Sequence, residues 1–329
     1  MTLRTAPIRL SDIHAPVRDR LDGVVDEIRR IVVSDFAPID EVNHYLMKIR
    51  GKLFRPGLVL LCDQLNGGAN PTAETLAAII ELVHLATLVH DDAVDHSVLR
   101  RGMPTVNALW SHQVAIIMGD YLYSRSISEI TRLGDLEPIR VIAAAANAMT
   151  VGEMRQLVSH DALGFGEGDY FRLIDSKTAS LMSAACEMGA LTGAPEHRDA
   201  LARYGTELGR AFQIADDLLD YTADSADTGK PSGLDLREHK VTLPLIHALP
   251  KLSKAERAGV EAFFRDPEPT DPAIHEVVEM VSRHGGLEYA RGLALQSAQR
   301  AHEALEGLPE GPALEALRDS IVYAVERRR

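Results

Sequence analysis

Cysteine is nearly missing from this chain. Its 329 residues include only Cys62 and Cys186, which lie far apart and lack the spacing of metal ligands. Two isolated cysteines do not make the disulfide framework that staples small secreted domains. We therefore expect both to be small core residues of a protein that stays in a reducing compartment.

Positive charge is also scarce. The chain has 35 Lys and Arg against 48 Asp and Glu, which gives a net charge of −13 at pH 7. Such a field repels nucleic acids, so we expect no nucleic-acid partner. Any polyanionic substrate would have to be held by local Lys and Arg clusters or by metal ions.

Long apolar runs are absent. A membrane-spanning helix needs about 18 or more apolar residues, and the best run, residues 79–89, is interrupted by Glu81 and His84. The first residues also lack an apolar core of signal-peptide length, and acidic residues follow closely. The sequence thus predicts no transmembrane segment and a cytoplasmic protein.

Helical periodicity is what the chain does contain. Apolar residues recur every three or four positions, and strand-like alternation is scarce. Gly- and Pro-rich stretches separate the periodic segments, but no linker or shift of composition divides the chain. We predict a single all-α domain, a helical bundle, over residues 1–329. The predicted helices cover residues 17–33, 58–65, 75–90, 107–132, 138–159, 170–191 and 198–221.

Two aspartate clusters of identical spacing interrupt this pattern. They lie about 125 positions apart and consist of Asp91, Asp92 and Asp95, and of Asp216, Asp217 and Asp220. Helical spacing places the first and last member of each cluster one turn apart on one face, where like charges repel. Partly buried carboxylates are costly unless something neutralises them. The clusters therefore predict a cavity between two helices that holds Mg²⁺, a cation suited to carboxylate and phosphate oxygens.

The surroundings of the first cluster favour an anionic substrate. His84 and Thr87 share one helical stripe with Asp91. Arg100 and Arg101 follow directly, and guanidinium groups can bind phosphate oxygens in a forked geometry. A solvated acidic helix face fits less well, because the flanking residues are apolar on both sides.

Polar residues near the second cluster point the same way. Gln213 lies one turn before Asp217, so its amide dipole should point into the same cavity. The polar stretch 222–240 is predicted to be a lid that closes over phosphate and brings Lys230 and Lys240 to it.

Two further lysine motifs are weaker signals. Lys177 and Thr178 lie in mid-helix among apolar residues, and spacing alone leaves open whether this lysine is a ligand or a solvated end. Lys52 and Arg55 stand near a predicted helix start, where free N–H groups favour anions. By itself this second motif would be a weak phosphate site.

Taken in order, these motifs resemble those of a known family. The chain carries Gly-Lys-x-x-Arg-Pro at 51–56, Glu-x-x-His at 81–84, Arg-Arg-Gly-x-Pro-Thr at 100–105, Gly-Glu-x-x-Gln at 152–156, Lys-Thr at 177–178, Phe-Gln-x-x-Asp-Asp-x-x-Asp at 212–220, Gly-Lys-Pro at 229–231, Gly-x-Asp-Leu at 233–236 and Thr-Leu-Pro at 242–244. The ordered set is similar to that of the trans-isoprenyl diphosphate synthases, the polyprenyl synthetase family. Leu53 departs from it by replacing an arginine of many members, and His239 by replacing a glycine.

The resemblance implies a fold, a reaction and a set of roles. It implies an all-α bundle around a deep central cavity, usually a homodimer, that condenses isopentenyl diphosphate with an allylic diphosphate. It implies that the six aspartates organise about three Mg²⁺ ions around the allylic diphosphate. Further contacts to this diphosphate would come from Arg100, Lys177, Lys230 and Lys240. Isopentenyl diphosphate would be held by Lys52, Arg55, His84 and Arg101. The dipoles of Thr178 and Gln213 would suit the positive charge that develops on the allylic carbon chain.

The resemblance also bears on product length. The product should grow back along the helix that ends at Asp91, where one turn rises about 5.4 Å, roughly one isoprene unit. Short-product members carry a bulky aromatic residue four or five positions before the first aspartate, where this chain has Thr87 and Ala86, with Val83 a turn further. We therefore predict a product of about C30–C50, with Tyr121 or Tyr123 as a candidate floor.

Three alternatives remain open at this point. One is a short-chain farnesyl or geranylgeranyl diphosphate synthase. Another is a partner subunit of a heteromeric synthase, although both aspartate clusters are intact. The third is a terpene cyclase, which would generally lack the motif at 51–56 and the second aspartate cluster.

Overall fold

Helices make up most of the structure. The computed structural model describes residues 8–49, 51–158, 162–222 and 233–326. Its α-helices are α1 (Leu10–Ile13), α2 (Arg18–Val32), α3 (Ala37–Leu46), α4 (Phe54–Asp63), α5 (Thr72–Val94), α6 (Val106–Leu109), α7 (His112–Arg132), α8 (Leu136–Val158), α9 (Glu167–Ile174), α10 (Ser180–Gly193), α11 (Arg198–Thr222), α13 (Leu234–Arg237), α14 (Leu243–Ala248), α15 (Lys254–Phe263), α16 (Asp271–Arg283), α17 (Gly286–Ala304) and α18 (Pro312–Glu326). Among the described residues the only strands are β1 (Leu99–Arg100) and β2 (Met103–Pro104), which pair as an antiparallel hairpin. The predicted all-α class is confirmed.

The predicted helices differ from the observed ones in several places. The segment 107–132 is divided into α6 and α7 at Ser111, whose hydroxyl accepts the Val114 N–H (3.2 Å) and caps α7. α3 was not predicted. The segment 170–191 is one helical run, but a π-helical turn at Asp175–Ala179 separates α9 from α10.

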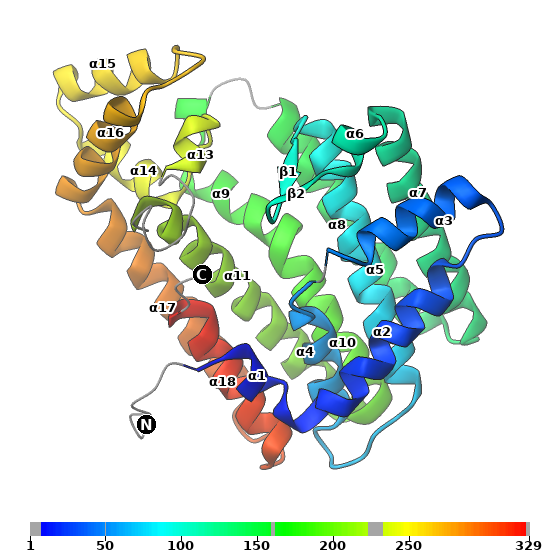
Figure 1. The fold of residues 1–329 in the computed structure, drawn as a ribbon. Coiled ribbons are helices and arrows are strands. Elements are labelled where there is room, and N and C mark those ends of the chain that lie inside the picture. Colours follow the sequence, from blue (N-terminus) through cyan, green and yellow to red (C-terminus); the bar gives the residue numbers. More distant parts are fainter. Residues whose placement is uncertain (1–7, 50, 159–161, 223–232, 327–329) are drawn as a thin grey trace.

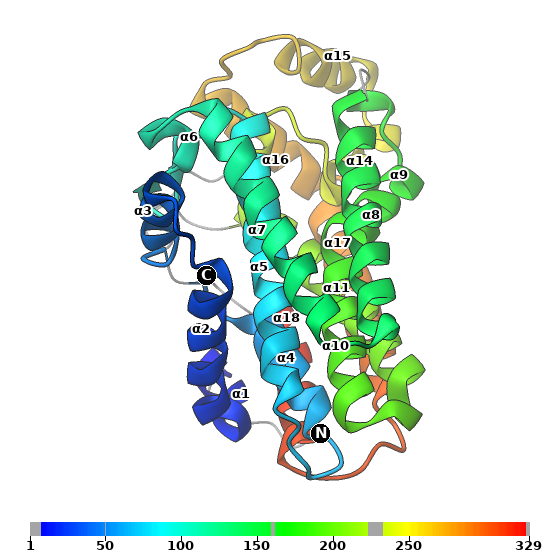
Figure 2. The same cartoon turned by 90° about the vertical axis from the view of Figure 1, so that its right-hand side faces the viewer.

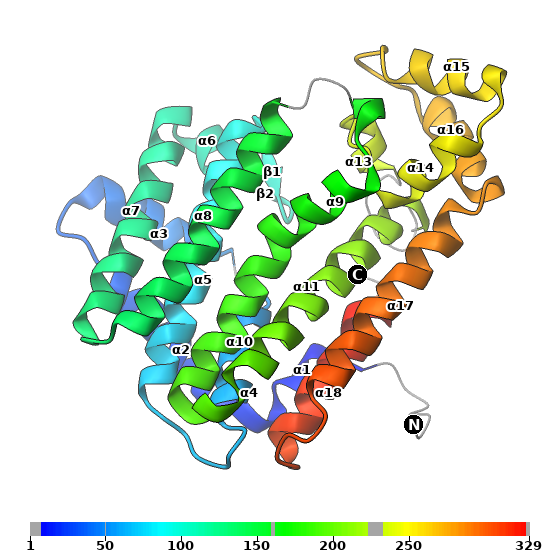
Figure 3. The ribbon, with the colours of Figure 1, turned by 180° about the vertical axis from the view of Figure 1, so that it is seen from behind.

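α5 is the central helix of the bundle. It packs against α2, α4, α7 and α10, and α10 in turn packs against α11, which packs against α17. Figure 3 shows α7, α8, α10, α11 and α17 in this succession across the molecule, and Figure 2 shows α5 beside α7. Within the described residues, α5 is the one helix with the length and apolar composition of a membrane span, and 56% of that window is buried. Its burial is that of a core helix.

Two apolar cores meet along α11, the helix that Figure 1 shows beside α17. The larger one surrounds α4, α5 and α10 and includes Leu208 of α11. The smaller one joins α9 to α14–α17 and includes Ile214 and Leu218. α11 contributes to both cores, and its second aspartate cluster lies in the part of the helix that packs into the smaller one.

Both cysteines lie in the larger core. Cys62 on α4 and Cys186 on α10 are fully buried, as predicted for small core residues. Their side chains form a hydrogen bond, and burial raises the pKa of Cys62 well above its usual range.

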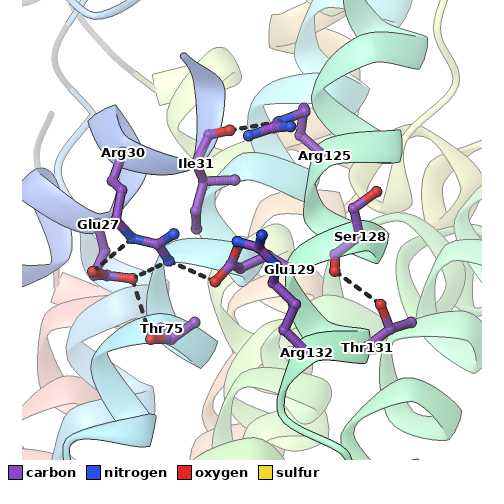
Figure 4. A network of polar contacts seen from close by, with 9 residues as sticks. All are labelled: Glu27, Arg30, Ile31, Thr75, Arg125, Ser128, Glu129, Thr131 and Arg132. Carbon is purple, nitrogen blue, oxygen red and sulfur yellow. Dashed lines mark hydrogen bonds and ion pairs between the residues drawn. The ribbon is translucent and has the colours of Figure 1, made fainter. Parts of the chain in front are cut away.

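A polar network ties α2 to α5 and α7 (Figure 4). Arg30 on α2 contacts Glu129 of α7 (2.6 Å) and Glu27 of its own helix (2.8 Å). Glu27 also accepts a hydrogen bond from the Thr75 hydroxyl of α5 (3.2 Å). The Arg125 guanidinium of α7 donates to the Ile31 carbonyl (2.6 Å). These contacts fix the position of α2 relative to α5.

Candidate active site

Two cavities adjoin the helices that carry the aspartates. The polar pocket, of about 640 Å³, is lined by Asp95, Gln156, Tyr170, Lys177, Thr178, Gln213, Asp217, Asp235 and Lys240, among others. The second cavity, of about 510 Å³, lies between α5, α7 and α8, and we call it the apolar cavity because its deeper part is lined by Val83, Ala86, Tyr123, Ala143, Ala146 and Met149. Its polar lining residues are Thr87, His90, Asp91, Asp120, Asn147, Thr150 and Glu153. Lys177 lines both cavities. The predicted cavity is therefore present, and its polar and apolar parts meet at one lysine.

The three side chains of the first aspartate cluster have different surroundings. Asp91 faces the apolar cavity and Asp95 the polar pocket. The buried Asp92 lines neither of these but a separate cavity between α2 and α5, and the Arg100 guanidinium donates to both of its oxygens, each at 2.8 Å. Asp92 thus contacts a cation of the protein itself.

The hairpin after α5 presents the two arginines. Arg101 (φ 52°) and Gly102 (φ 76°) form its two-residue turn, with both in the left-handed conformation that such turns require. Tyr45 of α3 donates its hydroxyl to the Pro104 carbonyl (2.6 Å) and anchors the other strand.

The second cluster belongs to a chain of hydrogen bonds. Asp217 is buried, and its two oxygens accept from the Tyr170 hydroxyl (2.5 Å) and the Gln213 amide (2.8 Å). The Gln213 carbonyl oxygen accepts in turn from the Thr178 hydroxyl (2.7 Å). This chain fixes the rotation of the amide whose dipole was predicted to point into the cavity.

A close approach of two helices makes that chain possible. At Gly209 of α11, an added Cβ would lie 2.6 Å from the Cα of Ala179 at the end of the π turn. Only a glycine leaves room for α11 there. The Arg210 guanidinium also donates to both carboxylate oxygens of Asp175 (2.6 and 2.8 Å), which links the π turn to α11.

Asp220 serves a different purpose from its two neighbours. Its carboxylate accepts the N–H groups of Leu234 and Asp235, both at 2.9 Å, and so anchors the segment that enters α13. Asp216 is exposed at the surface of α11. Of the predicted lid, residues 223–232, including Lys230, lie outside the described residues. Residues 235 and 238–240 line the polar pocket.

Lys177 is not a solvated helix end. It is half-buried, pairs with Glu153 of α8 and donates to the Gln156 side chain (3.2 Å). The π turn places it and Thr178 on the wall of the polar pocket. Widened turns of this kind are frequent at functional sites.

A third cavity, of about 570 Å³, lies between α2 and α5. It is lined by Gly51, Leu53, Glu81, His84, Arg100 and Arg101, together with apolar residues of α2 and α5. His84 and Thr87 were predicted to share one stripe, but they line different cavities, since that stripe runs along the boundary between them. Arg55 interacts electrostatically with Glu81, and Lys52 is exposed just before α4.

The candidate residues for product length also have different surroundings. Ala86, Thr87, Val83 and Tyr123 all line the apolar cavity. Tyr121 does not, because its hydroxyl donates to the carbonyls of Val32 and Val33 beside α2, both at 3.1 Å. Only Tyr123 of the two tyrosines is placed to contact a growing product.

Burial disfavours the charged form of three acidic groups of the site. Burial raises the pKa of Asp91 to about 6, that of Asp217 to about 8 and that of Asp235 to about 7. Burial, with Arg55 and Arg101 nearby, also lowers the pKa of His84 well below its usual range. His84 is thus a neutral hydrogen-bonding group at pH 7.

This donor set fits a divalent cation shared with a substrate. Across the described part of the chain, no three His, Cys, Asp or Glu side chains lie close enough to enclose a metal ion by themselves. Mg²⁺ keeps several waters and is bound through one or two carboxylates plus substrate phosphates. Asp91 and Asp95, one turn apart on adjoining cavities, suit that arrangement, and a bound cation would offset the burial of Asp91.

Comparison with known proteins decides which family this is. The family model described as Polyprenyl synthetase matches residues 37–281. The chain belongs to the polyprenyl synthetase family. Octaprenyl diphosphate synthase of Escherichia coli (strain K12) is 37% identical to it over 98% of this chain and 100% of the relative. The predicted family and the predicted type of enzyme, a trans-prenyltransferase, are confirmed.

Solved structures share the fold over nearly the whole chain. A decaprenyl diphosphate synthase from Rhodobacter capsulatus has a TM-score of 0.91 and 38% identity, covering 98% of this chain and 100% of its own. A polyprenyl synthase from Caulobacter crescentus CB15, complexed with calcium and isoprenyl diphosphate, has a TM-score of 0.91 and 32% identity, covering 99% and 100%. A short chain isoprenyl diphosphate synthase from Methanothermobacter thermautotrophicus is also 35% identical, over 92% of this chain and 95% of the relative. Overall identity therefore does not by itself fix product length.

Sequence reasoning missed three residues of the site. Tyr170 was not singled out, and Glu153 and Asp235 entered only as parts of motifs. Tyr170 could have been found, because it lies seven positions before Lys177 and so on the same helical face. The position of Asp235 in the pocket could not be predicted, since it depends on contacts between segments distant in sequence.

Proposed function

We propose that this chain condenses isopentenyl diphosphate with an allylic diphosphate to give a polyprenyl diphosphate of about C30–C50. The observation that carries the proposal is the junction of the polar pocket with the apolar cavity at Lys177. A diphosphate head in the first would place its hydrocarbon tail in the second.

The acidic residues take three roles in this proposal. Asp91, Asp95 and Asp216 bind about three Mg²⁺ ions, which stabilise the charge on the leaving diphosphate. Asp92 orients Arg100 toward the diphosphate. Asp217 and Asp220, which the sequence analysis assigned to the metals, orient Gln213 and the α13 segment instead, because their oxygens accept hydrogen bonds from the protein.

The cationic and dipolar residues act on the reacting groups. Lys177, Lys240 and Arg100 contact the allylic diphosphate, together with Lys230. The Thr178 and Gln213 oxygens face the positive charge on the allylic carbon, and the apolar walls exclude water that would quench it. Bound diphosphate removes the final proton, so that no protein base is required.

Isopentenyl diphosphate is proposed to bind at the third cavity, with its double bond reaching the allylic carbon of the neighbouring diphosphate. Lys52, Arg55 and Arg101 supply positive charge there, and His84 supplies a neutral hydrogen-bonding group. Burial raises the pKa of Glu81, and the positive charges of Arg55 and Arg101 lower it, so this carboxyl group interacts with both arginines.

Product length follows from what lines the apolar cavity. Ala86 and Thr87 lie one turn below Asp91 and leave room for a chain, and Val83 lies a turn deeper. Each turn of α5 accommodates roughly one isoprene unit. A medium- or long-chain product therefore fits the cavity better than a farnesyl or geranylgeranyl product.

One incubation tests both the reaction and the length. The purified chain is mixed with Mg²⁺, radiolabelled isopentenyl diphosphate and each allylic diphosphate in turn, and dephosphorylated products are sized by chromatography. A ladder ending at about C30 or beyond is expected. A stop at about C15 or C20 would retain the reaction and refute the length. No condensation with any primer would favour a partner subunit of a heteromeric synthase.

We also propose a homodimer in the cytoplasm. Ile116 and Ile117 of α7 and Val151, Met154 and Leu157 of α8 are large apolar side chains exposed on neighbouring helices. Large apolar side chains exposed together on neighbouring helices are typical of protein interfaces. Sedimentation of the wild-type chain and of Met154→Glu tests it, with a monomeric wild type as the contradicting outcome.

A further inference from the structure

His239 occupies a strained backbone conformation directly before Lys240. Its φ of 55° lies in the left-handed region, which is uncommon for residues other than glycine. Such a conformation persists only where the surroundings hold it in place. The residue therefore has partners that outweigh its strain.

Those partners belong to the end of α15. The His239 ring lies 5.7 Å from the ring of Phe264 and 6.1 Å from that of Phe263, centre to centre. Its Nε2 lies 2.8 Å from the carbonyl oxygen of Asp266, to which it donates as the Nε2–H form. The ring is thus held by two aromatic contacts and by one hydrogen bond at Nε2.

The neighbouring residues are tied on two sides. The carboxylate of Asp220 accepts the N–H groups of Leu234 and Asp235, which joins the segment to α11. Arg237 pairs with Asp271 of α16 and donates to the Pro269 carbonyl (3.1 Å). The segment 233–240 therefore spans from the second aspartate cluster to the α15–α16 pair.

This segment forms one wall of the polar pocket. Asp235, Glu238, His239 and Lys240 all line it. The Lys240 ammonium donates to Glu238 (2.6 Å), and the Lys240 N–H donates to the Asp235 carbonyl (2.7 Å). Because His239 precedes Lys240, its backbone angles set the direction in which the lysine side chain leaves the chain.

We propose that His239 is a positioning residue, which clamps the segment 235–240 to α15 and thereby holds Lys240 toward an allylic diphosphate in the polar pocket. The proposal deepens the proposed function and rests on it for the identity of the anion. A glycine at this position would adopt the same φ without strain but would lack the ring. The segment would then lose its link to Phe264 and Asp266 and keep only those at Asp220 and Arg237.

The decisive comparison is between His239→Gly and wild type. Affinity for a non-reactive thio analogue of farnesyl diphosphate is measured by calorimetry with Mg²⁺, so that binding is read without turnover. We expect about a tenfold weaker affinity in the variant, because small displacements of a positioning group are costly. The KM for the allylic diphosphate should rise by a similar factor while the KM for isopentenyl diphosphate stays within about twofold.

A second variant and a control keep the test specific. Phe264→Leu removes the aromatic face from the other side, and its effect should not add to that of His239→Gly, since both break one contact. His275→Ala, an exposed histidine on α16, should bind the analogue like wild type. Unchanged affinity in His239→Gly, or equal rises in both KM values, would overturn the proposal. A wild type that binds the analogue but condenses nothing would instead refute the proposed function.

Discussion

Arg100 holds both carboxylate oxygens of Asp92, with Nε to Oδ2 and Nη2 to Oδ1 each at 2.8 Å. A carboxylate in such a forked pair already has a cation of the protein as its partner. The two adjacent aspartates of the first cluster therefore have different partners, which supports the proposal that Asp91 binds metal while Asp92 orients Arg100.

Isosteric substitutions should separate these roles. Asp91→Asn should lower turnover by about three orders of magnitude or more, because it removes a metal ligand. Asp92→Asn should lower it by about 10- to 100-fold, since the Arg100 side chain loses its anchor. Steady-state kinetics of both variants at saturating Mg²⁺ provides the measurement.

Two controls complete this comparison. Asp199→Ala, an exposed aspartate at the start of α11, should leave turnover unchanged. Arg100→Lys combined with Asp92→Asn should cost no more than the worse single change. Equal losses in Asp91→Asn and Asp92→Asn would refute the division of roles.

A larger side chain on α5 and a smaller one on α7 should change the product length in opposite directions. Ala86→Phe fills the apolar cavity one turn below Asp91 and should shorten the main product to about C15–C20. Tyr123→Ala removes a side chain from its wall and should lengthen it. Chromatography of dephosphorylated products measures both.

Tyr121→Ala is the matched control for Tyr123→Ala. It deletes the same atoms from the same helix, but from a side chain whose hydroxyl bonds to the Val32 and Val33 carbonyls. Its product should keep the wild-type length, although stability should fall. A longer product from Tyr121→Ala alone would show that the cavity extends further than its present lining.

Local sequence patterns could predict much of this architecture. The course of α5 and α11 follows from apolar residues at three- and four-residue spacing, and the aspartates fall where those helices end. Ordered motifs then identified the family. Both inferences depend only on residues close in sequence.

What the sequence could not provide depends on packing between helices. The π turn around Lys177 carries no local signal, and the Asp92–Arg100 pair depends on how the hairpin folds back. His84 and Thr87 were placed on one stripe, yet the neighbouring helices divide that stripe between two cavities. Tyr121 and Tyr123, two positions apart on α7, face different helices for the same reason.

Tyr170 should prove to be part of the catalytic apparatus although it bears no charge. Tyr170→Phe removes the hydroxyl that donates to Asp217 and leaves the aromatic ring in place. The Asp217 side chain, and with it the Gln213 amide, should lose a fixed orientation. We expect kcat to fall by about tenfold with little change in the KM for isopentenyl diphosphate.

The ring itself provides the control for this change. Tyr170→Leu removes the hydroxyl and the buried ring together, so it should lower the melting temperature more than Tyr170→Phe does. If Tyr170→Phe keeps full kcat, the hydrogen bond to Asp217 is structural and the chain from Tyr170 to Thr178 has no role in turnover.

Metal binding should weaken in mild acid. Burial raises the pKa of Asp91 to about 6, and the carboxyl must lose its proton before it can bind Mg²⁺. The apparent Mg²⁺ constant for activity should therefore rise as the pH falls from 7 to 5, by up to about tenfold for each unit below 6. Titrations of activity with Mg²⁺ across this range measure it.

Stability without metal should show the opposite sign. A carboxyl whose pKa is higher in the folded than in the unfolded state binds more protons when folded, so its contribution to stability is present near pH 4 and is lost as the pH rises through about 6. Asp91→Asn has no titrating group at this position, so the variant does not lose this stability as the pH rises. In the presence of a chelator, the melting temperature of Asp91→Asn relative to wild type should therefore increase between pH 5 and pH 7. A constant difference across that range would mean that Asp91 titrates normally, and that its burial imposes no cost for a metal ion to relieve.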